Sequence, residues 1–325
     1  MWVDLQWKWW GGGVTQIQQV LFEVESPYAG RPYHVSGNAL FNAFADQVSG
    51  AARGAVHVSH GVFVPSEYGE FPAAHSMPGY AGKLGGSLPD VEAYADLFLY
   101  RDAAHRWLLD SRPRDAQNTL DVQTHGGRWA FAPESFFGVP EHQRNSKRRV
   151  PWFLHCYVHA PGDDSVLPVS TDALDGIQVG GQRNYGFGEL SVADTQLVDL
   201  DEVSFDGLRG YDEFSIELLS PFVLQSGVSG ADRQSVPSWW GEPRSGEVVD
   251  GDGLRRRGER LVTSDGVFEL ATVDHGHVVP YTGTDPVGTA RNGITRVGTH
   301  SRFGFGELRV RPADADRVSG RGEES

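Results

Sequence analysis

Residues 180–192 read GGQRNYGFGELSV, and residues 298–310 read GTHSRFGFGELRV. The matching glycines Gly186 and Gly304 are 118 residues apart, and the motif aromatic-Gly-Phe-Gly-Glu-Leu is kept in both stretches. Long self-similarity of this kind indicates a duplicated structural unit. The two stretches therefore predict two related domains, each closing with a glycine-rich loop that leads into a strand.

A second match lies upstream of each loop. Residues 22–28 read FEVESPY, and residues 216–222 read IELLSPF. Each copy thus opens with an apolar strand that ends in Ser-Pro-aromatic. The segment between the two motifs is longer in the first copy, so we expect large insertions there, at 50–89 and at 112–149.

These matches define a domain organisation. We predict a first domain over 1–200 with large insertions and a second domain over 211–312. The boundary lies in the acidic, weakly patterned stretch 194–210. Residues 313–325 form a polar tail that we expect to be disordered.

The secondary structure expected is of the mixed α+β class. Apolar residues at 39–45 favour a helix, with Ser36 or Asn38 as its N-cap. Partly alternating apolar patterns predict strands at 14–24, 152–159, 213–219 and 267–273.

The composition favours a folded, cytoplasmic protein. Apolar residues make up 39% of the chain and aromatic residues 11%, enough for a core. No apolar run approaches the length of a membrane span, and the first residues lack the features of a signal peptide. Cys156 is the single cysteine, which excludes a disulfide framework and a cysteine-based zinc site. We expect it to be a small buried apolar residue.

The formal net charge of −15 is unusual for a protein that binds nucleic acid. Lysine occurs only at Lys8, Lys83 and Lys147, and the other basic residues are arginines. An acidic surface with little lysine suggests a halophilic protein, kept soluble at high salt by its negative charge. On this interpretation only local arginine clusters describe the ligand, and stacking and backbone contacts carry more of the binding.

The glycine-rich loops carry the functional hypothesis. Glycine permits positive φ and close approach of another backbone, and successive N–H groups in such a loop can bind an anion. Tyr185 or Phe303 can stack on a base, and Arg183 or Arg302 can contact phosphate. The alternative is a tight turn before a strand, with Phe187 and Phe305 packed in the core.

The loop at 180–192 resembles the glycine-rich loop of the RAMP superfamily, the repeat-associated mysterious proteins of CRISPR effector complexes. Residues 30–44, GRPYHVSGNALFNAF, are similar to the element that links the first strand and first helix in that family. The chain departs from the family pattern at Ser36, where the family has proline. It departs again at Asn38 and Ala39, where the family has paired serines.

The resemblance implies tandem ferredoxin-like domains, similar to RNA-recognition motifs. With two glycine-rich loops, the chain looks most like the handle-binding subunit of type III complexes. It would hold the 5′ handle of a guide RNA beside other RAMP or effector subunits in an antiviral ribonucleoprotein, with no cofactor, metal or membrane. The RNA-binding candidates are Gly180, Gly181, Arg183, Tyr185, Gly186 and Gly188; Gly298, His300, Arg302, Phe303, Gly304 and Gly306; His34 and Asn38; and Lys147, Arg148 and Arg149.

Catalysis is the alternative. Some relatives cleave target RNA with an aspartate near residues 25–28, where this chain has only Glu25. Others process the guide with a histidine near the first helix, a position that His34 occupies here; it is the single catalytic candidate. We expect a binder rather than an enzyme. A metal-independent endoribonuclease that uses His34, or a RAMP scaffold in a derived complex without CRISPR guides, remains open.

Three further groups allow two interpretations each. The histidines of 274–277 are ordinary strand residues or metal ligands. The basic runs 145–149 and 254–257 are phosphate contacts or solvated loops. Trp239 and Trp240, in a loop rich in proline, glycine and serine, stack on bases or dock a partner subunit.

Overall fold

The computed structural model describes residues 16–30, 34–65, 86–105, 130–131, 134–135, 150–162, 164–231, 233–242 and 253–315. Within these ranges the fold is mixed α/β with mostly antiparallel strands, which confirms the predicted α+β class. No helix in them has both the length and the apolar character needed to cross a membrane. The stretch 145–149 and most of the expected tail lie outside the described residues.

The first half of the chain forms an eight-stranded sheet. Its main path runs β3-β5-β8-β1-β10-β9, with β4 and β7 pairing at β8. The expected strands at 14–24 and 152–159 correspond to β1 and β8. The bounds are β1 (Gln16–Val24), β3 (His34–Val35), β4 (His57–Val58), β5 (Gly61–Pro65), β7 (Glu134–Ser135), β8 (Val150–His159), β9 (Ile177–Gln178) and β10 (Glu189–Asp199); separately, β2 (Tyr28–Ala29) pairs with β6 (Ala130–Phe131).

Strand β1 lies at the centre of this sheet and is buried on both faces. Val20 and Phe22 belong to the same apolar cluster as the first helix. Leu21, between them, packs instead with Tyr100 of the helical stretch 99–105. Burial on both faces explains why the apolar alternation of β1 is only partial.

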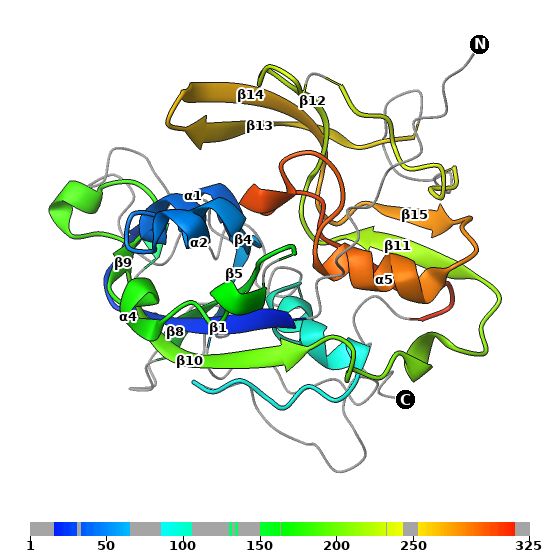
Figure 1. Ribbon diagram of the computed structural model, residues 1–325, viewed down its shortest axis with the longest axis horizontal. Helices are drawn as coiled ribbons and strands as arrows, with labels where there is room; N and C mark the ends of the chain where they lie inside the picture. The colour runs from blue at the N-terminus through cyan, green and yellow to red at the C-terminus, as the bar shows by residue number, and fades with distance from the viewer. Residues whose placement is uncertain are drawn as a thin grey trace, which may run out of the picture.

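The predicted first helix is present as α1 (Gly37–Phe44). Ser36 is its N-cap, because the Ala39 N–H donates to Ser36 Oγ at 3.2 Å. Leu40, Phe41 and Phe44 turn into the core cluster of the first half. Figure 1 shows α1 and α2 (Gly50–Ala55) beside each other over this sheet. Further helical segments that precede β11 are η1 (Tyr94–Phe98), η5 (Asp164–Val166), α4 (Thr171–Leu174), η6 (Arg183–Tyr185) and η7 (Asp206–Leu208).

The second half contains two small sheets, ordered β15-β11-β16 and β12-β14-β13. The expected strands at 213–219 and 267–273 correspond to β11 and β14. Helix α5 connects β15 to β16, packs against β16, and is drawn in orange in Figure 1. The bounds are β11 (Phe214–Leu218), β12 (Phe222–Ser226), β13 (Arg256–Thr263), β14 (Gly266–Val273), β15 (Val278–Tyr281), α5 (Pro286–Ile294), η8 (Ser301–Phe303) and β16 (Leu308–Pro312).

The second half departs from the helix–strand order expected of a duplicated domain. Between β11 and β15, the described residues form the sheet β12-β14-β13 instead of a helix and a strand. The glycine-rich loop nevertheless precedes the last strand in both halves.

Buried ion pairs join the two halves. Arg101 Nη2 lies 3.3 Å from Glu307 Oε2 and donates to Ser59 Oγ at 2.9 Å. Arg309 Nη1 lies 2.7 Å from Asp102 Oδ1. All four charged side chains are buried, and burial raises the pKa of both carboxyl groups. Since a buried charge is costly without its partner, these pairs fix the relative position of the halves.

Candidate nucleic-acid interface

The two glycine-rich loops adopt the same backbone conformation. In each, a left-handed residue, Gln182 with φ 62° or His300 with φ 64°, precedes a single 3-10 turn, η6 or η8. Matching glycines also have positive φ at matching positions. The paired values are 81° and 93° at Gly180 and Gly298, 79° and 91° at Gly186 and Gly304, and 77° and 82° at Gly188 and Gly306.

One glycine in each loop is required by a close backbone contact. A Cβ at Gly188 would lie 1.9 Å from the carbonyl oxygen of Val179, and a Cβ at Gly306 would lie 1.9 Å from that of Val297. At the base of each loop, the N–H of the same valine donates to the carbonyl of the same glycine at 2.9 Å, Val179 to Gly188 and Val297 to Gly306. These glycines therefore have a structural role in both copies.

The Ser-Pro motifs hold the loops in place. The Gly188 N–H donates to Pro27 O at 2.8 Å, and the Gly306 N–H donates to Pro221 O at 2.9 Å. One residue further on, the backbone N–H donates to the hydroxyl of Ser26 or of Ser220, at 2.8 Å in each case. The two sequence matches are thus parts of one repeated hydrogen-bonded unit.

The two glycine-rich loops differ in how far their side chains are exposed to solvent. In the first loop Arg183, Asn184 and Gly186 are exposed, and Tyr185 is 73% exposed. Phe187 is half-buried below them. The tip of this loop therefore presents an arginine and an aromatic ring to solvent.

The second loop packs against the first half instead. The Phe303 ring lies 5.3 Å from that of Phe41 in α1, and the Arg302 guanidinium lies over Phe41 at 4.6 Å. Arg302 also donates to the carbonyl of Arg53. Gly304, Phe305 and Gly306 are buried. Phe305 is therefore a core residue, as one of the two interpretations held.

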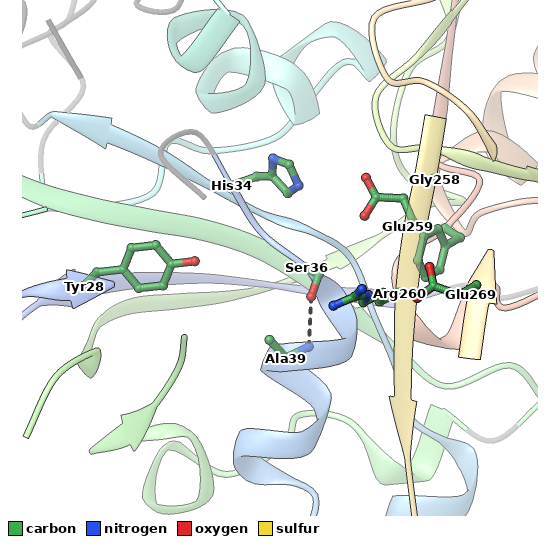
Figure 2. A pocket seen from close by; sticks show the side chains of 9 residues that line it. Tyr28, His34, Ser36, Ala39, Gly258, Glu259, Arg260 and Glu269 are labelled. Carbon is green, nitrogen blue, oxygen red and sulfur yellow. Dashed lines mark hydrogen bonds and ion pairs between the residues drawn. The ribbon is translucent and has the colours of Figure 1, made fainter. Parts of the chain in front are cut away.

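A cavity of about 510 Å³ lies between the two halves. The Tyr28 ring forms one wall and packs against Gly180 of the first loop, where a Cβ would meet it at 2.6 Å. Phe305, from the second loop, forms another wall. The second loop therefore lines the cavity directly, whereas the first loop contacts one of its wall residues, Tyr28. Its lining, most of which Figure 2 labels, consists of Tyr28, His34, Ser36, Ala39, Gly258, Glu259, Arg260, Glu269 and Phe305.

His34 lies in β3, just before α1, and its ring is close to two other histidines. Its ring centroid is 5.5 Å from those of His60 and His275. His275 Nδ1 lies 2.9 Å from Asp274 Oδ1, so the carboxylate orients this imidazole. Although burial opposes ionisation of Asp274, the hydrogen bond from His275 and the nearby arginines lower the pKa of this carboxyl. Among the described residues no group of side chains has the arrangement of a metal site.

The other predicted residues fall in three places. Asn38 is buried, and its amide exchanges two hydrogen bonds with the backbone of Val262, at 2.7 and 3.0 Å, tying α1 to β13. His300 Nε2 lies 2.8 Å from Ser226 Oγ, and burial lowers the pKa of this imidazole. Lys147, Arg148 and Arg149 lie outside the described residues.

The tryptophan pair and the second basic run have intramolecular contacts. Trp240 packs against Phe222 at 5.0 Å, and both tryptophans border the core of the second half. Arg255 and Arg257 lie 3.6 and 3.7 Å from the Asp274 carboxylate. Both arginines therefore form ion pairs with Asp274.

Sequence reasoning missed the second-half wall of the cavity. Glu259, Arg260 and Glu269 lie in a hairpin, β13–β14, whose sequence has no motif to mark it. Tyr28 carried a signal, because it ends the repeated Ser-Pro-aromatic motif. His275 was interpreted as an ordinary strand residue or a metal ligand, and its approach to His34 depends on the docking of the two halves.

No family model matches the chain, and a search of curated proteins finds no match to its sequence.

Proposed function

We propose that this protein is an RNA-binding subunit of a RAMP-type CRISPR ribonucleoprotein and holds guide RNA at the first glycine-rich loop. The observation that carries the proposal is the exposed tip of that loop, which presents Arg183 and Tyr185 to solvent. Exposed aromatic rings stack on unpaired bases, and arginine contacts phosphate.

The strand order of the first half supports the proposal. The path β5-β8-β1-β10, with α1 and α2 after β1 and α4 between β8 and β10, follows the order of a ferredoxin-like βαββαβ unit. RNA-recognition motifs are built in this way. We propose that the second half is a reduced copy, in which β15-β11-β16 and α5 are kept and β12-β14-β13 replaces the first helix and the strand after it.

The second loop has a different role in this proposal. Because Arg302 stacks on Phe41 and bonds to the backbone of Arg53, it stabilises the junction between the halves. Replacing Arg302 would disturb the junction between the halves as well as any contact with RNA. The first loop is therefore the better place to test RNA contact.

The test is direct binding of single-stranded RNA to the full chain, at low salt and at molar potassium chloride. The double variant Arg183→Glu, Tyr185→Ala removes a cation and a stacking ring from the exposed tip. We expect binding about 10- to 100-fold weaker, because one stacked base contributes about 1–3 kcal/mol.

The matched control is Arg209→Glu, Tyr211→Ala, which makes the same changes at two other exposed residues. It should bind RNA as the wild type does. Equal affinity of the loop variant and the control variant would contradict RNA contact by this loop.

A second candidate function is metal-independent RNA cleavage, favoured by the approach of His275 to His34. Two imidazoles at this separation can act as acid and base: one accepts the 2′-hydroxyl proton, and the other protonates the departing 5′ oxygen, leaving a 2′,3′-cyclic phosphate. Asp274 would orient His275 for either role.

The two candidates predict different results on a gel. As a binder, the wild type leaves repeat RNA uncut in the presence of EDTA, and His34→Ala changes affinity only modestly. Site-specific cleavage by the wild type, abolished by both His34→Ala and His275→Ala with binding retained, would establish the endoribonuclease instead. Loss of an acid or base typically lowers the rate about 10²- to 10⁴-fold, which a time course resolves.

A further inference from the structure

Strand β13 forms one edge of the sheet β12-β14-β13, and it pairs with β14 along its whole length without a register shift. In an antiparallel ladder, the backbone groups of successive residues point alternately toward the neighbouring strand and away from it. Val262 fixes this alternation, because its N–H and C=O both bond to the Asn38 carboxamide. The N–H and C=O groups of Arg260 and Gly258 therefore also point away from β14.

These four backbone groups lie at an open edge. Gly258 and Arg260 are both exposed, and within the described part of the chain no atom bonds to their N–H or C=O groups. The Arg260 guanidinium turns toward β14, where its Nε is 2.9 Å from Glu269 Oε1. A Cβ at Gly258 would meet no atom within 4 Å. An exposed strand edge of this kind is a template for a further strand.

The next position along the edge shows which chemistry fits. Asn38 Nδ2 donates to Val262 O at 2.7 Å, and the Val262 N–H donates to Asn38 Oδ1 at 3.0 Å. A carboxamide carries the same donor and acceptor as a peptide group, so this pair of bonds reproduces the contact that one residue of a neighbouring strand makes. The edge of β13 thus binds an amide at Val262 and is open at the two positions that follow.

The cavity of about 510 Å³ borders the open positions. Gly258 and Arg260 are part of its lining, and Figure 2 shows β13 on the side of the cavity opposite His34. A strand beside β13 would turn alternate side chains to opposite faces of the sheet. On the inner face they would meet Phe305, which lines the cavity and packs with Leu261 of β13.

We propose that the edge of β13 at Gly258 and Arg260 binds an extended segment of another protein subunit as an added strand. Such a segment has apolar side chains at every second position, against Phe305, and polar side chains between them. The formal net charge of −15 disfavours a second copy of this chain and favours a segment flanked by lysine or arginine. The inference does not depend on RNA contact by the first glycine-rich loop.

The experiment uses the synthetic peptide Lys-Val-Thr-Val-Thr-Val-Lys, blocked at both ends and labelled with a fluorophore. Full-length protein is titrated into the peptide, and into two versions that carry N-methyl groups either on both threonine amides or on two valine amides. In an added strand, one of these sets of N–H groups faces β13 and the other faces away. We expect one methylated peptide to bind about 10- to 100-fold more weakly than the other, because it loses two hydrogen bonds to the edge.

The variant Gly258→Pro removes one N–H from the edge and places a ring there. It keeps the ladder to β14, because that N–H points away from β14 and proline is tolerated at such edge positions. We expect the unmethylated peptide to bind about 10-fold more weakly or worse. Gly258→Ala keeps the N–H, adds a methyl group that meets no atom within 4 Å, and should bind the peptide as the wild type does.

The outcomes separate this inference from the proposed function. Equal binding of the two methylated peptides, or no binding of any peptide, would overturn the added strand, as would displacement of the bound peptide by single-stranded oligouridine. The comparison of methylated peptides uses unaltered protein, so it remains decisive even if Gly258→Pro lowers stability. RNA contact is tested separately at Arg183 and Tyr185, so either proposal can fail while the other stands.

Discussion

Gly188→Ala is expected to destabilise the protein by about 2–5 kcal/mol, whereas Gly186→Ala, two residues earlier, should cost only about 1–2 kcal/mol. Both glycines have positive φ, 77° and 79°, so both changes carry the left-handed penalty of about 1–2 kcal/mol. The surroundings differ. Nothing lies within 4 Å of a Cβ at Gly186, but a Cβ at Gly188 would lie 1.9 Å from a backbone oxygen. Displacing that backbone adds about 1–3 kcal/mol.

Urea unfolding of the two variants measures the difference. Gly306→Ala should behave like Gly188→Ala, because its Cβ would also lie 1.9 Å from a valine carbonyl. This is a test of the repeat as a physical unit and does not depend on any ligand. Equal urea midpoints for the Gly186 and Gly188 variants would contradict this prediction, because they would show that the backbone at the base of the loop moves aside without loss of stability.

Acid is expected to unfold the protein through its buried histidines. Burial, with Arg296 nearby, lowers the pKa of His57 to about 3, and burial, with Arg101 nearby, lowers that of His60 to about 3. Burial also holds the pKa of His155 and His159 well below its usual value. In the unfolded chain these groups titrate near 6.5, so below that pH the unfolded state binds more protons than the folded state.

The stability from these histidines is fully present above pH 6.5 and is lost as the pH falls toward 3. In this pH window, each such histidine lowers the free energy of unfolding by about 1.4 kcal/mol for each unit by which the pH falls. Asp102 and Glu307, whose pKa is raised, act in the opposite sense, but the four histidines outnumber them among the described residues. We expect the urea midpoint at fixed salt to fall steeply between pH 6.5 and 4.5.

His57→Phe is the matched variant. In the wild type the rings of His57 and His159 lie 5.0 Å apart, so phenylalanine keeps an aromatic ring at this contact and removes one titrating group. Its stability should fall less steeply with pH than that of the wild type. A wild-type midpoint that does not change between pH 6.5 and 4.5 would contradict this account.

The repeated motifs predicted the local structure well. Because the positive-φ glycines, the Ser-Pro anchors and the following strand recur in both copies, the two loops share one conformation. The Ser36 N-cap and the first helix were also predictable, since both depend on neighbouring residues. These features are set by the chain within a few positions.

Features that depend on distant contacts were not predictable. The aromatic residue before the shared GFGEL sequence is exposed in the first loop, as Tyr185, and packs against α1 in the second, as Phe303, since only docking of the halves decides its exposure. Strand β13 buries just Glu259 and Leu261 along its length, so it lacks the apolar alternation of a half-buried strand. The cavity joins Tyr28 to residues more than 200 positions away, and no local pattern marks such a meeting.

The most direct test of RNA binding at the first loop is a cross-linking map. Full-length protein is irradiated with RNA that contains 4-thiouridine, and the cross-linked peptides are identified by mass spectrometry. The account predicts cross-links within residues 180–188, centred on Tyr185, and none at Tyr211, which is also exposed. Cross-links confined to other surfaces, with none in that loop, would contradict it.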